Sequence, residues 1–311
     1  MLIVLIVVAS LLSPVFLTTR NLGNVLSETS VAAVLAMGQL LVILTAGIDL
    51  SVGATLSLCT VAGALIYEHT GSGIAAVVTL LGLGLVVGLI NGIVFVKGRL
   101  PHSFINTLAM LGVASGVALL LSNGEPIVGM PGIINTLGSF DGNVPVSIFL
   151  VIGLALLCWL LTRFLVWGRW IYAVGADREA AQRVGIPVSR VLISVYALSG
   201  LAAGFGAAIT AGQIAGGSPT VGQNAELDAI AAVIIGGASL MGGRGALGQA
   251  LVGAFMIGVI HNALNILNIN ADYQYIVIGV VVVLAVEGDV LRRAIENRRR
   301  TAEGLRLEEG Q

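Results

Sequence analysis

The chain has 311 residues, of which 57% are hydrophobic and only 10% are charged, and its mean hydropathy is +1.02. A soluble domain is usually about a quarter charged, and so few polar groups do not cover a water-exposed surface. The net charge of −1 gives no basic field for binding nucleic acid. The composition therefore predicts an all-α polytopic membrane protein and excludes a soluble globule.

Apolar runs of about 20 residues are long enough to cross roughly 30 Å of hydrocarbon. We predict about ten transmembrane helices, at 2–18, 29–47, 51–68, 74–96, 103–121, 145–166, 191–213, 226–242, 247–267 and 273–291. The run 226–242 is short and begins with two acids, so we expect it to be tilted, broken or only partly inserted. Residues 1–291 then form one transmembrane domain, and 292–311 form a polar, basic cytoplasmic tail.

The basic residues orient these helices. With Met1 in the cytoplasm, 14 of the 15 Lys and Arg residues fall on the cytoplasmic side, and Arg20 alone falls outside. This distribution follows the positive-inside rule, and the reverse topology violates it. We therefore predict that both termini are cytoplasmic, that the longest outside loop is roughly 122–144 and that the longest inside connection is roughly 167–190.

Glycines recur four residues apart within three of the predicted helices: Gly84, Gly88 and Gly92; Gly112 and Gly116; Gly200 and Gly204. This spacing puts small residues on one face, so that two helix backbones can approach closely. Both tight static packing and faces that slide during transport remain open.

A weak internal repeat surrounds two of the predicted breaks between helices. The tripeptide TAG at 45–47 precedes SVG at 51–53, and TAG at 210–212 precedes TVG at 220–222. The first break faces the cytoplasm and the second faces outward. This is the pattern of a 5+5 inverted repeat, although tripeptides of common residues also match by chance.

The sequence carries no recognisable enzyme chemistry. It contains no G-x-x-x-x-G-K-[ST] phosphate loop, no H-E-x-x-H and no C-x-x-C. No pair of carboxylates, catalytic triad, charge cluster or metal cluster can be assembled from it, and the predicted spans hold almost no ionisable residues. We expect no catalytic residue, no metal and no cofactor on this chain.

Asp49 lies in the first break, where an acid is costly unless it is solvated, paired or capping a helix. It can accept hydrogen bonds from the N–H groups that open the next helix. The alternative is a gate or a subunit contact on a transport pathway.

The inside connection specifies a short helix over 177–185. Asp177 can cap its start, Glu179 lies in the first turn, Arg183 lies in the last turn, and Gly185 with Pro187 ends it. Such a rigid cytoplasmic helix fits a knob that inserts into a partner, or it is an ordinary capped loop.

Further polar residues within or beside the predicted spans have two interpretations each. Glu226 and Asp228 complement the positive end of their helix or contact an external partner. The amides bond across helices or contact a polyol as it passes. These amides are Gln39, Asn91, Asn106, Asn262 and Asn265.

Four segments, read together, resemble the permease subunit of ribose-type sugar importers of the bacterial ATP-binding cassette class, in the branched-chain amino acid/ribose permease family. They are LVILTAGIDLSVGA at 41–54, NGIVFVKGRLPHSFINTLAM at 91–110, GRWIYAVGADREAAQRVGI at 168–186 and ELDAIAAVIIGGASLMGGRG at 226–245. The likeness extends from about residue 12 to about 290.

The resemblance implies a permease that imports a monosaccharide across the bacterial inner membrane. It implies a second permease copy or paralogue, a cytoplasmic ATPase pair that uses ATP and Mg, and a periplasmic sugar-binding protein. In the family, the loop that matches 177–185 docks on the ATPase as a coupling helix. We therefore expect ATPase-coupling roles for Gly175, Asp177, Arg178, Glu179, Ala180, Ala181 and Gly185. Asp49 and the five amides are pathway or gate candidates, and Glu226 and Asp228 are binding-protein contact candidates.

Two alternative functions differ in their energy source: a secondary transporter is driven by an ion gradient, and a channel or passive facilitator uses no energy source. A stand-alone secondary transporter usually holds ionisable residues within the membrane for its coupling ion, and the predicted spans have almost none. A channel or passive facilitator has no need of the specified cytoplasmic helix.

Overall fold

The computed structural model describes residues 1–270 and, after them, 273–274, 276–277, 279–280, 283–284 and 287–288. Six of its helices are long and apolar enough to cross a membrane: α2 (Thr19–Leu44), α4 (Gly73–Lys97), α5 (Ser103–Ser122), α7 (Ser147–Phe164), α10 (Val188–Ile214) and α12 (Leu247–Ile266). The protein is therefore an all-α polytopic membrane protein, as the composition predicts.

The other helices are α1 (Leu2–Leu12), α3 (Val52–Thr70), α6 (Gly132–Leu137), α8 (Val166–Ala176), α9 (Arg178–Arg183) and α11 (Ala225–Ile235). Four two-residue strands form two antiparallel pairs. One pair joins β1 (Ile127–Val128) to β4 (Gly216–Gly217), and the other joins β2 (Phe140–Asp141) to β3 (Val144–Pro145).

Three predicted spans have different bounds in the structure. The run 2–18 is helical only over Leu2–Leu12, which rises about 16 Å, because Pro14 cannot continue the helix. The run 29–47 begins ten residues earlier, at Thr19, since the Thr18 side chain accepts a hydrogen bond from Asn21 N and caps the helix. The run 226–242 is a half-length helix over Ala225–Ile235.

The tenth predicted span, 273–291, lies mostly outside the described residues, and the predicted tail 292–311 lies entirely outside them. The count of ten and the 5+5 repeat therefore stay predictions.

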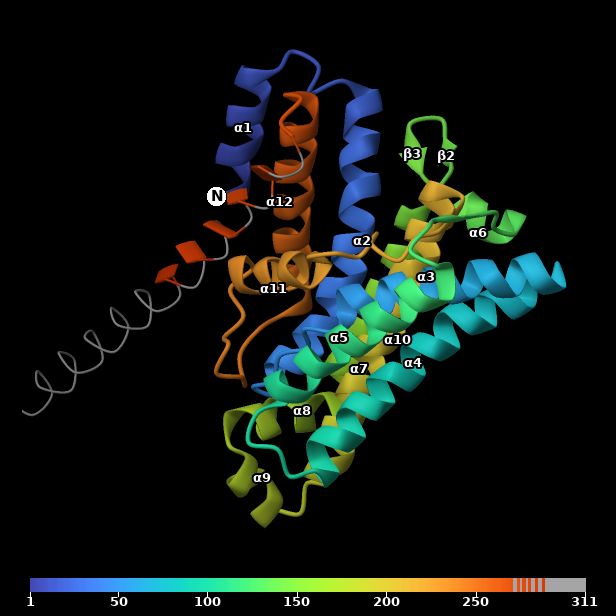
Figure 1. Cartoon of the computed structure of the whole chain (residues 1–311). Helices are drawn as coiled ribbons and strands as arrows, with labels where there is room; N and C mark the ends of the chain where they lie inside the picture. The colour runs from blue at the N-terminus through green and yellow to red at the C-terminus, as the bar shows by residue number, and fades with distance from the viewer. Residues whose placement is uncertain (271–272, 275, 278, 281–282, 285–286, 289–311) are drawn as a thin grey trace, which may run out of the picture.

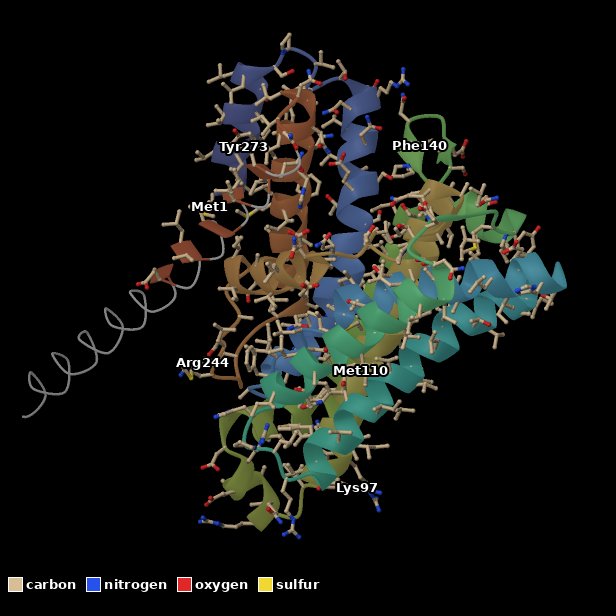
Figure 2. The ribbon with its side chains drawn as sticks, viewed as in Figure 1. Met1, Lys97, Met110, Phe140, Arg244 and Tyr273 are labelled. Carbon is tan, nitrogen blue, oxygen red and sulfur yellow. The ribbon has the colours of Figure 1, made fainter. Side chains whose placement is uncertain are left out.

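Long helices form the body of the molecule, and α11 crosses it (Figure 1). The α2 and α12 helices run side by side, α4 runs alongside α10, and α11 lies across them. The short helices α8 and α9 sit at one end of the bundle, and the β2–β3 hairpin sits at the other. Figure 2 places Lys97 toward the α9 end and Phe140 in the opposite hairpin.

Glycine contacts bring α4 and α10 together. A Cβ atom on Gly88 would collide with the carbonyl of Tyr196, and one on Gly200 would collide with the carbonyl of Gly84. The predicted close approach is therefore confirmed for this pair of helices. Within the described chain α5 makes no such approach, because a Cβ at Gly112 or Gly116 meets no atom within 4 Å, so the expectation for these two glycines stays a prediction.

The two breaks that carry the weak repeat meet inside the protein. The α2 helix ends at Leu44, and α3 begins at Val52. The α10 helix ends at Ile214, and α11 begins at Ala225. Gly53, in the first turn of α3, packs directly against the backbone of Gly222 and the side chain of Glu226. The amino-terminal ends of α3 and α11 are thus in contact.

Candidate functional site

A polar cavity of about 530 Å³ lies between α2, α10, α11 and α12. The α2 helix contributes one face to it, at positions 28, 31, 32 and 35, and α12 contributes positions 258, 261 and 265. These spacings of three, four and seven residues put side chains on one side of a helix. The polar side chains that line the cavity are Glu28, Thr210, Gln213, Gln223, Asn224, Asp228, His261, Asn265 and Gln274.

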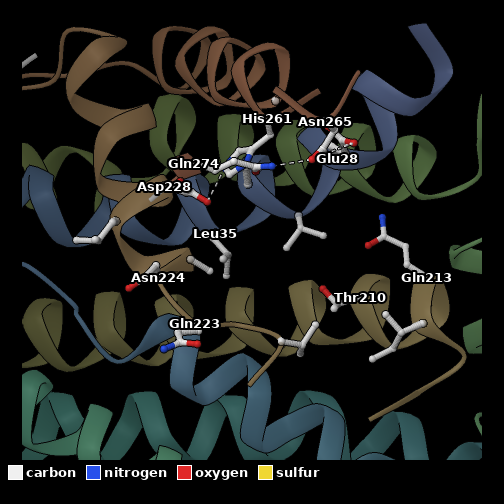
Figure 3. A pocket seen from close by; sticks show the side chains of 17 residues that line it. Glu28, Leu35, Thr210, Gln213, Gln223, Asn224, Asp228, His261, Asn265 and Gln274 are labelled. Carbon is white, nitrogen blue, oxygen red and sulfur yellow. Dashed lines mark hydrogen bonds and ion pairs between the residues drawn. The ribbon is translucent and has the colours of Figure 1, made fainter. Parts of the chain in front are cut away.

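The charged groups lie together with Asn265 and Gln274 on one side of this cavity, whereas the other amides lie apart from them (Figure 3). The Nε2 atom of His261 lies 3.1 Å from Oδ2 of Asp228. Asn265 donates from Nδ2 to Oε1 of Glu28 at 3.3 Å, and Gln274 donates from Nε2 to Oδ1 of Asn265 at 2.8 Å. Three helices therefore share one hydrogen-bonded cluster at the cavity wall.

This cluster corrects the sequence-based expectation that no charge cluster can be assembled. Glu28 lies 200 positions before Asp228, and only the packing of α2 against α12 and α11 brings both acids beside His261. The spacing of His261 and Asn265, four residues apart on one apolar helix, is the sequence signal that could have pointed to this wall.

The Glu28 carboxylate at the cavity wall is only partly satisfied by hydrogen bonds. The Oε2 atom of Glu28 is buried and has no hydrogen-bond partner within the described chain. No Phe, Tyr or Trp stands among the described residues that line the cavity. The polar side chains of this lining can accept and donate hydrogen bonds.

Asp49, by contrast, is engaged on both carboxylate oxygens. Its Oδ1 accepts from the Ser51 amide at 3.0 Å and from the Ser51 hydroxyl at 2.7 Å, and its Oδ2 accepts from Ser199 Oγ at 3.0 Å. The Gln39 amide, oriented to satisfy both of its groups, pairs with the backbone N–H and carbonyl of Asp49. Asp49 is 1% exposed, and its contacts hold the first break in place.

Two predicted amides extend this network away from the cavity. Asn91 donates from Nδ2 to Ser51 Oγ at 2.8 Å, and Asn106 donates from Nδ2 to the Asn91 carbonyl at 3.1 Å. Gln39, Asp49, Asn91 and Asn106 therefore form one buried group that joins α2, α3, α4, α5 and α10. Their role on a pathway or gate stays a prediction.

The remaining predicted residues near the cavity separate into lining and structural positions. Asn265 and Asp228 line it. Asn262 exchanges amide hydrogen bonds of 2.8 and 3.1 Å with Asn21, which fastens α12 to α2. Glu226 is 8% exposed and lies against Gly53. Contact of Glu226 and Asp228 with an external partner stays a prediction.

The helix expected in the inside connection is confirmed as α9. The Asp177 side chain accepts from the Ala180 amide at 2.9 Å, and Gly185 has a φ of +83°, the left-handed conformation that ends the helix. Glu179 and Arg183 form an exposed ion pair at 3.1 Å. The outward face includes Ala180 and Val184, whereas Ala181 is buried.

The inner side of the α8–α9 connection packs on the end of α2. A Cβ on Gly175 would collide with the Leu44 carbonyl, so only glycine fits there. Partial burial lowers the pKa of the Arg178 guanidinium, because removal from water disfavours the charged form. Arg178 is the one predicted coupling residue whose charged group turns toward the transmembrane body, where it contacts Thr45 and Phe95.

Known proteins match most of the chain. The sequence model of the family described as "Branched-chain amino acid transport system / permease component" matches residues 21–286. The ribose import permease protein RbsC of Escherichia coli (strain K12) is 40% identical over 295 residues, which cover 92% of this chain and 90% of that protein.

Two further relatives have similar coverage. The RbsC protein of Bacillus subtilis (strain 168) is 38% identical over 293 residues, with 92% and 89% covered. The fructose import permease protein FrcC of Rhizobium meliloti is 36% identical over 284 residues, with 88% of this chain and 79% of that protein covered. No solved structure matches the chain.

Proposed function

This chain belongs to the family of branched-chain amino acid transport system permease components, and we propose that its polar cavity is where the transported sugar enters the protein. The chain is the permease subunit of a sugar importer of the ATP-binding cassette class, a multi-pass protein of the inner membrane. We propose a monosaccharide as its substrate, ribose or a related sugar, in line with the names of its relatives.

The cavity carries this proposal because its chemistry matches a polyol in transit. Carboxylates and amide oxygens accept hydrogen bonds from sugar hydroxyls, and amide nitrogens donate to hydroxyl oxygens. Glu28, Asp228 and Asn265 place such acceptors and donors along the cavity wall.

The topology of the chain supports a cavity that opens first to one side of the membrane and then to the other. The first turns of α3 and α11 touch, and in this proposal α2 corresponds to α10 and α3 to α11. We propose that these are equivalent parts of a 5+5 inverted repeat with ten spans. Discontinuous helices that meet near a substrate site are typical of such repeats.

Energy comes from outside the chain in this proposal. Two permease copies, or one copy and a paralogue, rock against each other when a cytoplasmic ATPase pair binds ATP and Mg. The α9 helix docks on the ATPase, and a periplasmic binding protein delivers the sugar. The end of the bundle that carries α9 and Lys97 faces the cytoplasm in this proposal, and both termini lie on the cytoplasmic side, as the distribution of Lys and Arg along the sequence predicts.

Neutralising the Glu28 carboxylate tests the cavity. In proteoliposomes that contain the permease, its ATPase and a sugar-loaded binding protein, Glu28→Gln should lower ATP-driven sugar uptake about tenfold, because a charged acceptor is lost. Glu68→Gln, at an exposed carboxylate on α3 outside the cavity, is the matched control and should transport normally. Equal uptake by both variants would show that the cavity does not lie on the transport pathway.

Replacing 177–185 by a Gly/Ser linker tests the docking role of α9. The variant should insert into the membrane but lose ATP-driven uptake, since a flexible linker transmits no movement. Uptake at the native rate would contradict the role.

The charged cluster beside the cavity is also what a gradient-driven transporter would need. Vesicles that contain the permease alone, with a proton or sodium gradient and no ATPase, should therefore fail to concentrate sugar. Concentration under these conditions would favour a secondary transporter instead.

A further inference from the structure

Arg178 is the point where α9 is fastened to the membrane-spanning helices. Its Nη2 atom donates to the carbonyl of Thr45, the first residue after α2, at 3.5 Å. Its guanidinium carbon lies 5.2 Å from the centre of the Phe95 ring on α4, within cation–π range. One side chain of the coupling segment therefore contacts the ends of two long helices.

The contact continues from Phe95 into α10. The rings of Phe95 and Tyr196 meet edge to face with their centres 5.8 Å apart. Tyr196 is fully buried, and its hydroxyl abuts Gly47 in the first break. Arg178 and Tyr196 thus both contact the segment 45–51, and Phe95 packs against each of them.

The segment 45–51 is itself a rigid link. Asp49 bonds Ser51 at the start of α3 and Ser199 on α10, and Ser51 accepts from Asn91 on α4. A shift of Thr45 is therefore passed to α3 rather than absorbed by a loose loop. Close packing makes such a segment respond as a unit.

The first turn of α3 connects this segment to the cavity. Gly53 packs on Gly222, and the Gly222 amide donates to Ser57 Oγ at 2.9 Å. The next residues of that loop, Gln223 and Asn224, line the cavity. Contacts therefore run without a gap from α9 to the wall that faces the sugar.

We propose that Arg178 is a positioning residue that couples α9 to the 45–51 segment and, through α3, to the sugar cavity. The proposal rests on the proposed function of α9 as the ATPase-docking helix. It divides α9 by face: Glu179, Ala180 and Val184 face outward toward the ATPase, whereas Arg178 faces the transmembrane body. Coupling between α9 and the cavity is a free energy that variants at Arg178 change, so it can be measured directly.

Hydrogen exchange on the purified permease tests the link without any partner. Arg178→Ala should speed exchange of amides in 45–51 about tenfold, because loss of a charged hydrogen bond lowers the cost of local opening. Arg183→Ala is the matched control, since its described partner is Glu179 on the same exposed helix, and it should leave this segment unchanged. An unchanged rate in Arg178→Ala overturns the link.

The number of sugars imported per ATP hydrolysed tests the role. In proteoliposomes with the ATPase and the sugar-loaded binding protein, Arg178→Ala should import at least about fivefold less sugar per ATP hydrolysed. Arg163→Ala, at an exposed arginine in the last turn of α7 and outside α9, should keep the native ratio. Phe95→Leu should act in the same direction, and the double variant should be no worse than Arg178→Ala, because both remove one interaction.

The two measurements separate the possible failures. Additive effects of Arg178→Ala and Phe95→Leu, or a native ratio in Arg178→Ala, overturn the coupling role of Arg178. If the unmodified permease itself shows no ATP-dependent uptake, the proposed function fails, and hydrogen exchange still decides whether Arg178 holds the 45–51 segment.

Discussion

The group around Asp49 and the wall of the cavity use the same kinds of side chain to opposite effect. Asp49 has donors on both carboxylate oxygens and is 1% exposed. Glu28 accepts from Asn265 on one oxygen, and the other has no partner within the described chain. A saturated buried acid stabilises one conformation, whereas an unsaturated acid beside a cavity retains bonding capacity for a ligand.

The hydrogen-bond partners of a polar residue inside a membrane protein therefore indicate its role more reliably than its residue type does. Asn, Gln, Asp and Glu occur in both regions, and only the partners of each atom tell them apart. The comparison predicts that substitutions around Asp49 cost stability, whereas those at the cavity wall cost transport.

The largest effect is expected at Asp49. Asp49→Ala removes the acceptor for Ser51 and Ser199 and leaves buried donors unpaired, so the free energy of unfolding should fall by about 3 kcal/mol. Unfolding of the purified protein in detergent micelles measures this. In the Asp228→Ala variant, at the cavity wall, the free energy of unfolding should fall by less than half as much. Similar losses in the two variants would break the distinction between the regions.

The asparagines of α12 sharpen the comparison on one helix. Asn262→Ala breaks the paired amide contact with Asn21 and should lower the free energy of unfolding by roughly 2 kcal/mol. Asn265→Ala should change stability by less than about 1 kcal/mol but reduce sugar uptake severalfold, because Asn265 lines the cavity. Thermal unfolding and proteoliposome uptake, measured on both variants, check the pair. The reverse result would mean that Asn265 holds the helices together and that Asn262 serves transport.

The smallest effect is expected for single hydroxyl groups. Thr210→Val removes a cavity hydroxyl and should lower uptake about twofold with little change in stability. Thr55→Val removes a buried hydroxyl that has no partner within the described residues, so it should leave uptake unchanged and stability equal or higher. A loss of stability in Thr55→Val would show that this hydroxyl has a partner in the membrane or the assembly.

Local features of the chain are predictable because they depend on neighbouring residues. The hydropathy predicts most of the long helices, since each apolar run is set by its own side chains. The α9 helix is predicted down to the cap at Asp177 and the stop at Gly185, because a cap needs only residues within one or two turns. Hydropathy alone misplaces helix ends that are set by capping, such as the start of α2 at Thr19.

The sequence by itself determined that the chain is a helical membrane protein of the sugar-permease kind and that it carries a rigid short helix in its inside connection. Only the tertiary structure decided which polar residues hold the helices together and which line the cavity. It brought Glu28 beside His261 and turned Asp49 into a saturated buried group. The physical reason is that hydrogen-bond saturation depends on atoms from helices far apart in the chain, and no local pattern encodes which of those helices will meet.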